Sequence, residues 1–106
     1  MRPVELAVVF LLIVPASAAA EPGASDRQAL RHLVLQDCGS CHGMTLKGGL
    51  GGPLLPGALE GKDADALAEV ILHGIEGTPM PGWKGLLSPS EARWIAAELK
   101  KGSFVE

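Results

Sequence analysis

Apolar residues recur at helical spacing in three stretches of this 106-residue chain, and we find no stretch with the alternation expected of a strand. Each stretch begins at a residue that favours the N-cap of a helix, namely Ser25, Asp63 or Ser88. Ser25 with Gln28 and Ser88 with Glu91 also have the form of a capping box. The pattern predicts an all-α domain with helices at about 25–37, 63–73 and 88–101, and a fraying end over residues 104–106.

The N-terminal segment is organised like a secretory signal peptide. Arg2 precedes an apolar run over residues 6–14, and small residues at 18–20 form a cleavage site. The run is shorter than the ~20 apolar residues that a membrane-spanning helix needs, which argues against a retained anchor. We therefore expect a cleaved signal peptide over residues 1–20, a mature domain over residues 21–106, and export to the periplasm without stable membrane insertion.

Charge and composition narrow the function of the mature domain. Removal of Arg2 and Glu5 with the signal leaves 8 basic and 11 acidic side chains, a net charge of −3. A nucleic-acid-binding protein would favour a basic patch, so that class of partner is not expected. The mature domain has only Trp83, Trp94 and Phe104 as aromatic residues. A domain this small with so few large side chains would have a marginal core unless a bound group filled it.

The chemistry of the chain centres on Cys38, Cys41 and His42. Two cysteines separated by two residues, with a histidine directly after the second, form the attachment pattern of a c-type haem. At this spacing both thiols can reach the two vinyl groups on one edge of a porphyrin, and the next side chain then lies under the iron. We expect Cys38 and Cys41 to hold one haem c as thioethers and His42 to be an axial ligand of its iron.

Three other kinds of site use similar residues. A disulfide between the cysteines would suit an exported protein, but it gives His42 no role. A zinc site would need further ligands, and His32 and His73 do not stand at zinc-finger spacing. A thioredoxin-like redox pair would need a βαβ unit. The export signal and the distal features described below favour haem, and we expect His32 and His73 to be ordinary helix residues.

Residues 43–61 are rich in glycine and proline but carry no phosphate-binding pattern. Glycines suit a backbone that must approach a flat ring closely. The carbonyl of Pro53 could accept a hydrogen bond from the second ring nitrogen of His42, which would fix the tautomer and raise the basicity of the ligand. A plain turn proline explains Pro53 equally well, so both interpretations stay open.

Met80 is the expected sixth ligand of the iron. It lies between Pro79 and Pro81, in a stretch that cannot be helical. A methionine usually fills a core, but a haem with a histidine ligand on one face needs a ligand on the other, and a His/Met pair is the usual arrangement in cytochromes c. His73 is the rival sixth ligand. We expect Trp83 to cover the ring or to donate a hydrogen bond to a haem propionate.

The sequence resembles the small class I cytochromes c over nearly the whole mature chain. The likeness is carried by a helix running into Cys38-x-x-Cys41-His42, a Gly52-Pro53-x-Leu55 loop, a middle helix, a Met80-Pro81 loop and a C-terminal helix. This resemblance implies the fold of that family, with three main helices around one covalently bound haem. It also implies that Leu30 and Leu33 in the first helix meet Trp94 and Ile95 in the last.

A narrower resemblance, carried by residues 36–51, 71–74 and 77–81, is to the cytochrome c-55X type. Those cytochromes accompany the periplasmic nitrite reductase of denitrifying bacteria, which contains haem c and haem d1. The resemblance implies either electron delivery to this reductase or maturation of its haem. We expect a one-electron carrier that donates to the reductase and is not an enzyme, because a haem with both axial positions filled has no open site for substrate chemistry. The alternatives are an accessory factor in haem d1 biosynthesis or reductase maturation, and a small haem enzyme with an open sixth position. One departure is the doubled glycine before Pro53, where a single one is expected.

Overall fold

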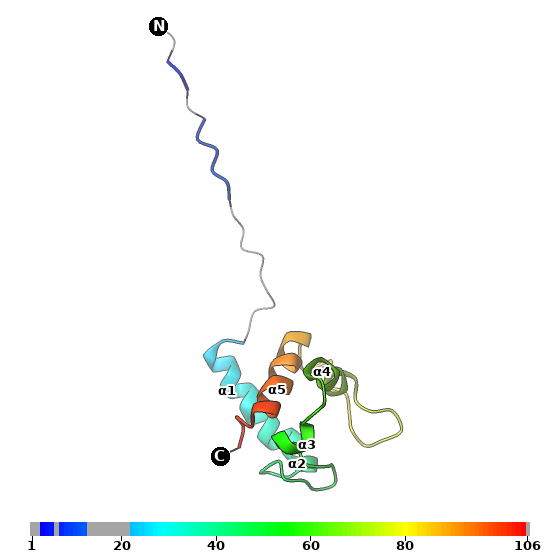
Figure 1. The fold of residues 1–106 in the computed structure, drawn as a ribbon. Helices are drawn as coiled ribbons and strands as arrows, with labels where there is room; N and C mark the ends of the chain where they lie inside the picture. The colour runs from blue at the N-terminus through cyan, green and yellow to red at the C-terminus, as the bar shows by residue number, and fades with distance from the viewer. Residues whose placement is uncertain (1–2, 6, 13–21, 106) are drawn as a thin grey trace.

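The computed structural model describes residues 3–5, 7–12 and 22–105 of the chain. All regular secondary structure in these residues is helical, which confirms the all-α prediction. The elements, drawn in Figure 1, are α1 (Ala24–Leu33), a π-helical segment η1 (Val34–Cys38), α2 (Gly39–His42), α3 (Pro56–Leu59), α4 (Ala64–His73) and α5 (Pro89–Lys101).

The N-terminal residues 3–5 and 7–12 have no regular secondary structure, and their side chains are exposed. The predicted cleavage site at residues 18–20 lies outside the described residues. In the part of the chain that the structure describes, we find no helix with the length and apolar character needed to cross a bilayer.

The first helix begins one residue before its predicted cap. α1 begins at Ala24, Gly23 occupies the N-cap position, and no side chain caps the helix there. The predicted capping box of Ser25 and Gln28 was therefore wrong, because Ser25 lies within the first turn. Asp26 also lies in that turn, where a negative charge is favoured by the helix dipole.

The first helix also extends further than predicted, because η1 joins α1 to α2 without a break. The backbone N–H of Gly39 donates to the carbonyl of Val34, five residues earlier. This wider turn keeps Gly39 on the buried side of the helix with Leu30 and Val34, whereas α-helical spacing would rotate it away. The predicted end near Asp37 was wrong, and the helix continues through both cysteines to His42.

The starts of α4 and α5 confirm the two predicted caps. The Asp63 carboxylate accepts a hydrogen bond from the Ala66 N–H at 3.3 Å. Ser88 Oγ accepts from the Glu91 N–H at 3.1 Å, and Glu91 Oε1 accepts from the Ser88 N–H at 2.9 Å. Each cap of this kind stabilises its helix by about 1 kcal/mol. The short helix α3, which starts at Pro56, was not predicted and lies in the segment expected to be a loop.

The core consists mostly of small and medium-sized apolar side chains, with Phe104 as the one aromatic residue among the described residues that are fully part of it. α4 and α5 pack against each other, and α3 packs against α5. Leu30 and Ile95 belong to this core, and Leu33 and Trp94 pack against it. The residues that the resemblance paired across the first and last helices therefore belong to one hydrophobic cluster.

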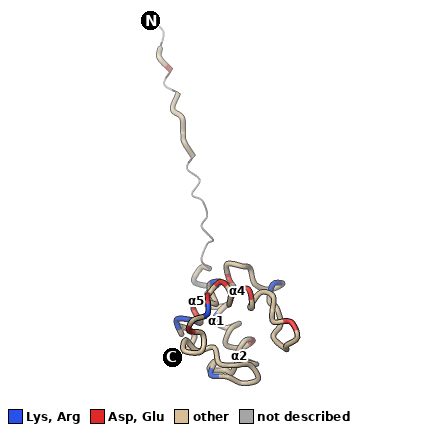
Figure 2. The backbone as a smooth tube through the Cα atoms, turned by 45° about the vertical axis from the view of Figure 1, so that its right-hand side comes forward, with Lys and Arg blue, Asp and Glu red and all other residues tan. Residues whose placement is uncertain are grey.

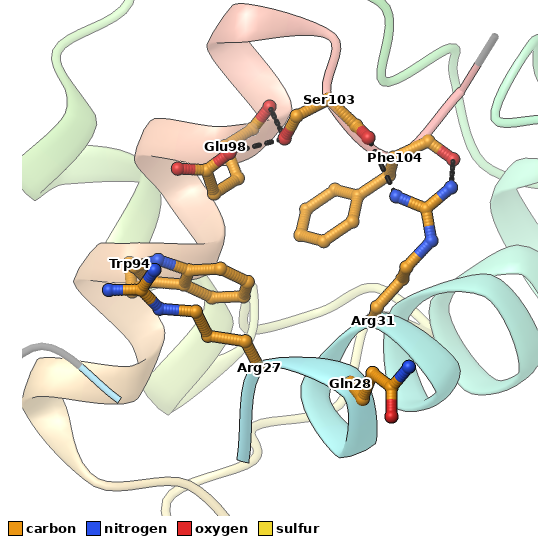
Figure 3. Close-up of a pocket in the computed structure, with 7 residues that line it drawn as sticks. All are labelled: Arg27, Gln28, Arg31, Trp94, Glu98, Ser103 and Phe104. Carbon is orange, nitrogen blue, oxygen red and sulfur yellow. Dashed lines mark hydrogen bonds between the residues drawn. The ribbon is translucent and has the colours of Figure 1, made fainter. Parts of the chain in front are cut away.

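The C-terminal tail is anchored rather than frayed at Phe104. This side chain is only 3% exposed, and its ring lies edge-on to Trp94, with ring centroids 5.8 Å apart. Arg31 Nη1 donates to the Ser103 carbonyl at 2.7 Å, and Nη2 donates to the Phe104 carbonyl at 3.3 Å. Figure 3 shows these contacts of Arg31 and Phe104 beside a shallow cavity of about 230 Å³ between α1 and α5. The expected fraying at Phe104 was therefore wrong.

Candidate functional site

The two cysteines lie one helical turn apart at the junction of η1 and α2. Residues three apart on a helix are neighbours on one side, so both thiols project from the same part of the helix. Both are free thiols. Cys38 is half-buried, and burial, reinforced by the charge of Asp37, raises the pKa of its thiol to about 11. Cys41 is exposed. Neither sulfur is used in a disulfide, and that of Cys41 is the more accessible of the two.

His42 is the last residue of α2, and its ring is held by a backbone carbonyl. The distance from His42 Nδ1 to the Gly52 oxygen is 2.7 Å. A carbonyl can only accept, so Nδ1 carries the proton in this contact and Nε2 is the nitrogen left to bind a metal. The predicted type of contact is present, but its acceptor is Gly52 and not Pro53. The doubled glycine accounts for a shift of one residue.

Pro53 acts on this contact through the residue before it. A proline disfavours the helical conformation of the preceding residue and holds it extended. Gly52 does not have a positive φ, in contrast to several glycines elsewhere in the chain. Pro53 therefore constrains the peptide that presents the Gly52 carbonyl to the ring, while a contact of Pro53 with a cofactor remains a prediction.

The loop after His42 returns to cover the end of α2. The Gly48 N–H donates to the His42 carbonyl, and the Gly51 N–H donates to the Cys41 carbonyl, both at 2.8 Å. The loop reverses direction at Gly43, where φ is +91°. Between Cys38 and Leu59 Lys47 is the only Lys, Arg, Asp or Glu, so the chain near α2 is almost uniformly tan in Figure 2. A flat apolar group would meet few charges here.

Met80 lies in the loop between α4 and α5, which is fixed at its base by α4. The Trp83 N–H donates to the Ile71 carbonyl at 2.9 Å, and the Lys84 N–H donates to the Leu72 carbonyl at 3.0 Å. The Met80 carbonyl accepts from the Ile75 N–H at 3.3 Å. The Met80 N–H donates to Thr78 Oγ1, also at 3.3 Å. Met80 is partly exposed and held by its backbone, which leaves its thioether free of a core-filling role.

The other residues singled out in the sequence, His73, His32 and Trp83, lie on helices or pack against the core. His73 ends α4, and its Nε2 lies 3.1 Å from Glu69 Oε2, one turn earlier on the same helix. His32 is exposed on α1. Trp83 is half-buried and packs against the core. Among the described residues, no three His, Cys, Asp or Glu side chains form a group that could hold a metal ion. The histidines thus do not join the cysteines in a zinc-like set.

Two features of the site were missed by reasoning from the sequence. Residues 34–38 contain no sequence pattern that predicts a π-helix. The only indication is the spacing of Leu30, Val34 and Gly39, which can be recognised once it is known that all three are buried. For the acceptor at Gly52, the doubled glycine before Pro53 was the one sign in the sequence that the contact could be shifted. Both depend on how the helix and the returning loop pack, which local propensity does not report.

Comparisons with known proteins agree on one family. Residues 25–97 match the family model described as "Cytochrome C oxidase, cbb3-type, subunit III". The chain is 50% identical to cytochrome c55X of Paracoccus denitrificans (strain Pd 1222), over 91% of this chain and 93% of that protein. It is 37% identical to dihydro-heme d1 dehydrogenase of Pseudomonas aeruginosa, over 93% of this chain but only 19% of that protein. Among solved structures it is similar to "c-type cytochrome NirC", with a TM-score of 0.78, 49% identity and coverage of 80% of this chain and 100% of that chain.

Replacement of Gly74 by alanine is expected to loosen the Met80 loop. A Cβ at this position would lie 2.5 Å from the Met80 carbonyl oxygen, and φ is +70°. We expect a loss of roughly 1 kcal/mol or more in unfolding free energy, together with faster hydrogen exchange at the Trp83 and Lys84 amides. Gly85→Ala is the matched control, because its Cβ would meet nothing within 4 Å. Equal exchange at these amides in both variants would contradict the prediction.

Proposed function

The chain belongs to the cytochrome c55X family of c-type cytochromes, and from this membership we propose that it is an exported monohaem cytochrome that carries single electrons to a haem d1-containing nitrite reductase. The signal peptide would be removed near Ala20, which leaves residues 21–106 as the haem-carrying domain. The proposal extends the family assignment to a haem count, a compartment and a partner.

The donor set of the site fits a covalently attached haem. Cys38 and Cys41 supply two free thiols one turn apart, and each would add its sulfur and hydrogen across one vinyl double bond. His42 offers Nε2 to the iron, and Met80 offers a thioether from a separately anchored loop. A haem held in this way supplies a one-electron ferric/ferrous couple. The chain itself provides the attachment, the two ligands and their orientation.

The observation that carries the proposal is the 2.7 Å contact between His42 Nδ1 and the Gly52 carbonyl. A histidine that ligates a metal typically donates its other N–H to a carbonyl or carboxylate, which fixes its tautomer and raises its basicity. Here the contact lies directly after the two thiols of the attachment pattern. With His42 and Met80 as the two axial ligands, no position would remain for a substrate on the iron, which supports a carrier rather than an enzyme.

The proposed partner follows from two relatives. One is named cytochrome c55X, and the other is named a dihydro-heme d1 dehydrogenase, of which 19% matches this chain. These names support a place within the haem d1 nitrite reductase system. The dehydrogenase match also supports the second candidate, an accessory factor in haem d1 biosynthesis or reductase maturation. That factor would bind a client in the same system without donating electrons to the reductase.

The two candidates are separated by mixing reduced protein with purified haem d1-containing nitrite reductase under anaerobic conditions. With the protein in large excess over the reductase, we expect the ferrous absorbance to fall at first only by the few electrons that the reductase haems take up, and to decay completely after nitrite is added, with one electron lost per molecule. Addition of nitrite without the reductase is the control. If no oxidation occurs and a client complex forms equally well with both oxidation states, the accessory role replaces the carrier role.

Intact mass of the purified exported protein checks haem attachment and processing together. We expect a chain beginning near Glu21 with the mass of one haem added, and the colour should stay with the chain in acid–acetone. Cys38→Ala and Cys41→Ala should lower the yield of holoprotein, because the small apo domain has a marginal core. Freely extracted pigment, or an unmodified mass, would contradict covalent attachment.

Substitution of Met80 by alanine tests the sixth ligand. We expect the weak near-infrared band of ferric Met-ligated haem to be present in the wild type and absent from Met80→Ala, while His73→Ala retains it. The reverse pattern would assign the sixth position to His73. A wild-type ferric protein that is high-spin and binds peroxide readily would instead indicate an open sixth position and a haem enzyme.

A further inference from the structure

Gly51 lies against the ring of His42 and leaves no space for a side chain. A Cβ built on Gly51 would lie 2.6 Å from both Nδ1 and Cε1 of His42, and 3.1 Å from Nε2. Carbon atoms do not approach a ring at 2.6 Å, since the optimal separation is about 3.5–4.0 Å. Any residue other than glycine at this position must therefore displace either its own backbone or the imidazole.

The backbone of Gly51 is held from both sides, so the imidazole is the part that would move. The Gly51 N–H donates to the Cys41 carbonyl at 2.8 Å, and the Gly51 carbonyl accepts from the Gly49 N–H at 2.9 Å. These bonds fix Gly51 against the peptide that immediately precedes His42. The ring is joined to the chain by two rotatable bonds, which makes rotation its easiest response.

The neighbouring Gly52 has the opposite property. A Cβ built on Gly52 would meet nothing within 4 Å, and its φ is not positive. Its carbonyl accepts the hydrogen bond from His42 Nδ1, and an alanine keeps that carbonyl. Two adjacent glycines thus differ sharply, because only the first is required to be small by the histidine ring.

We propose that Gly51 is a positioning residue that sets the plane of the His42 imidazole relative to the haem, and this inference rests on the proposed role of His42 as axial ligand. Rotation of the ring away from a side chain at position 51 would lengthen or misalign the bond from Nδ1 to the Gly52 carbonyl. A weaker bond makes the imidazole a less basic ligand. A less basic ligand stabilises ferric iron less, so the reduction potential rises.

The experiment compares three alanine variants of the haem-loaded protein. Gly51→Ala places a Cβ against the ring, Gly52→Ala meets nothing within 4 Å, and Gly102→Ala, at the end of α5, meets only Pro56 within 4 Å. The readouts are the reduction potential, the paramagnetic shifts of the ferric haem methyl protons, which depend on the plane of the axial imidazole, and thermal stability. Gly102→Ala thereby controls for a general loss of stability without contact with the ring.

We expect a raised potential and altered methyl shifts in Gly51→Ala alone, with both close to wild type in Gly52→Ala. Gly102→Ala is expected to lose thermal stability, because its φ is +76°, while keeping the wild-type potential and methyl shifts. Equal potentials and shifts in Gly51→Ala and Gly52→Ala, or equal changes in Gly51→Ala and Gly102→Ala, would overturn the positioning role.

If Gly51→Ala yields too little holoprotein, yields are compared instead. Loss of attachment in that variant alone supports the proposal, and equal loss in Gly102→Ala overturns it. A wild-type protein without covalent haem would overturn the positioning role together with the proposed function, so the two failures are distinguishable.

Discussion

The end of α2 imposes the constraint on which the site depends. The last carbonyls of a helix have no partner within it and must be satisfied by something else. Here the Cys41 and His42 carbonyls are satisfied by Gly51 and Gly48 of the returning loop. The same return brings the Gly52 carbonyl to His42 Nδ1. The same stretch of loop therefore caps the helix and orients the His42 ring. The loop needs glycine because its backbone passes so close to the end of the helix.

The π-helical segment, which precedes α2, determines how the helix reaches this end. It lets the helix bury Leu30, Val34 and Gly39 on one side and still present Cys38, Cys41 and His42 in sequence at its end. The core that the helix packs into contains few large side chains and no buried polar or charged residue among those described. A domain of this size gains little from such a core alone. A covalently held group would add apolar contacts where the chain itself has few.

Prediction from sequence succeeded for two of three local caps, failing at Ser25, and it missed the features whose cause is tertiary. The caps at Asp63 and Ser88 follow from side chains that bond to backbone within three residues, so the sequence contains the whole interaction. The π-helical segment, by contrast, places Gly39 on the buried side with Val34, and that burial depends on the rest of the fold. Phe104 is buried because it packs on Trp94 of the preceding helix and because Arg31, far away in sequence, donates to its carbonyl. The attachment pattern could be recognised from spacing alone, but the acceptor for His42 depended on the path of a loop.

The way in which each proposed ligand is held suits the proposed carrier role. His42 is oriented by a carbonyl whose peptide is constrained by Pro53, and Met80 lies between two prolines in a loop bonded to α4 at its base. Constraints of this kind would keep the surroundings of a bound iron similar in both oxidation states and so lower the reorganisation energy of each electron transfer. The surface nearby is sparsely charged, and Met44 and Leu50 are 55% and 96% exposed on the loop after His42. Contact there would rest on apolar complementarity with few ion pairs, which suits a partner that must bind briefly and leave.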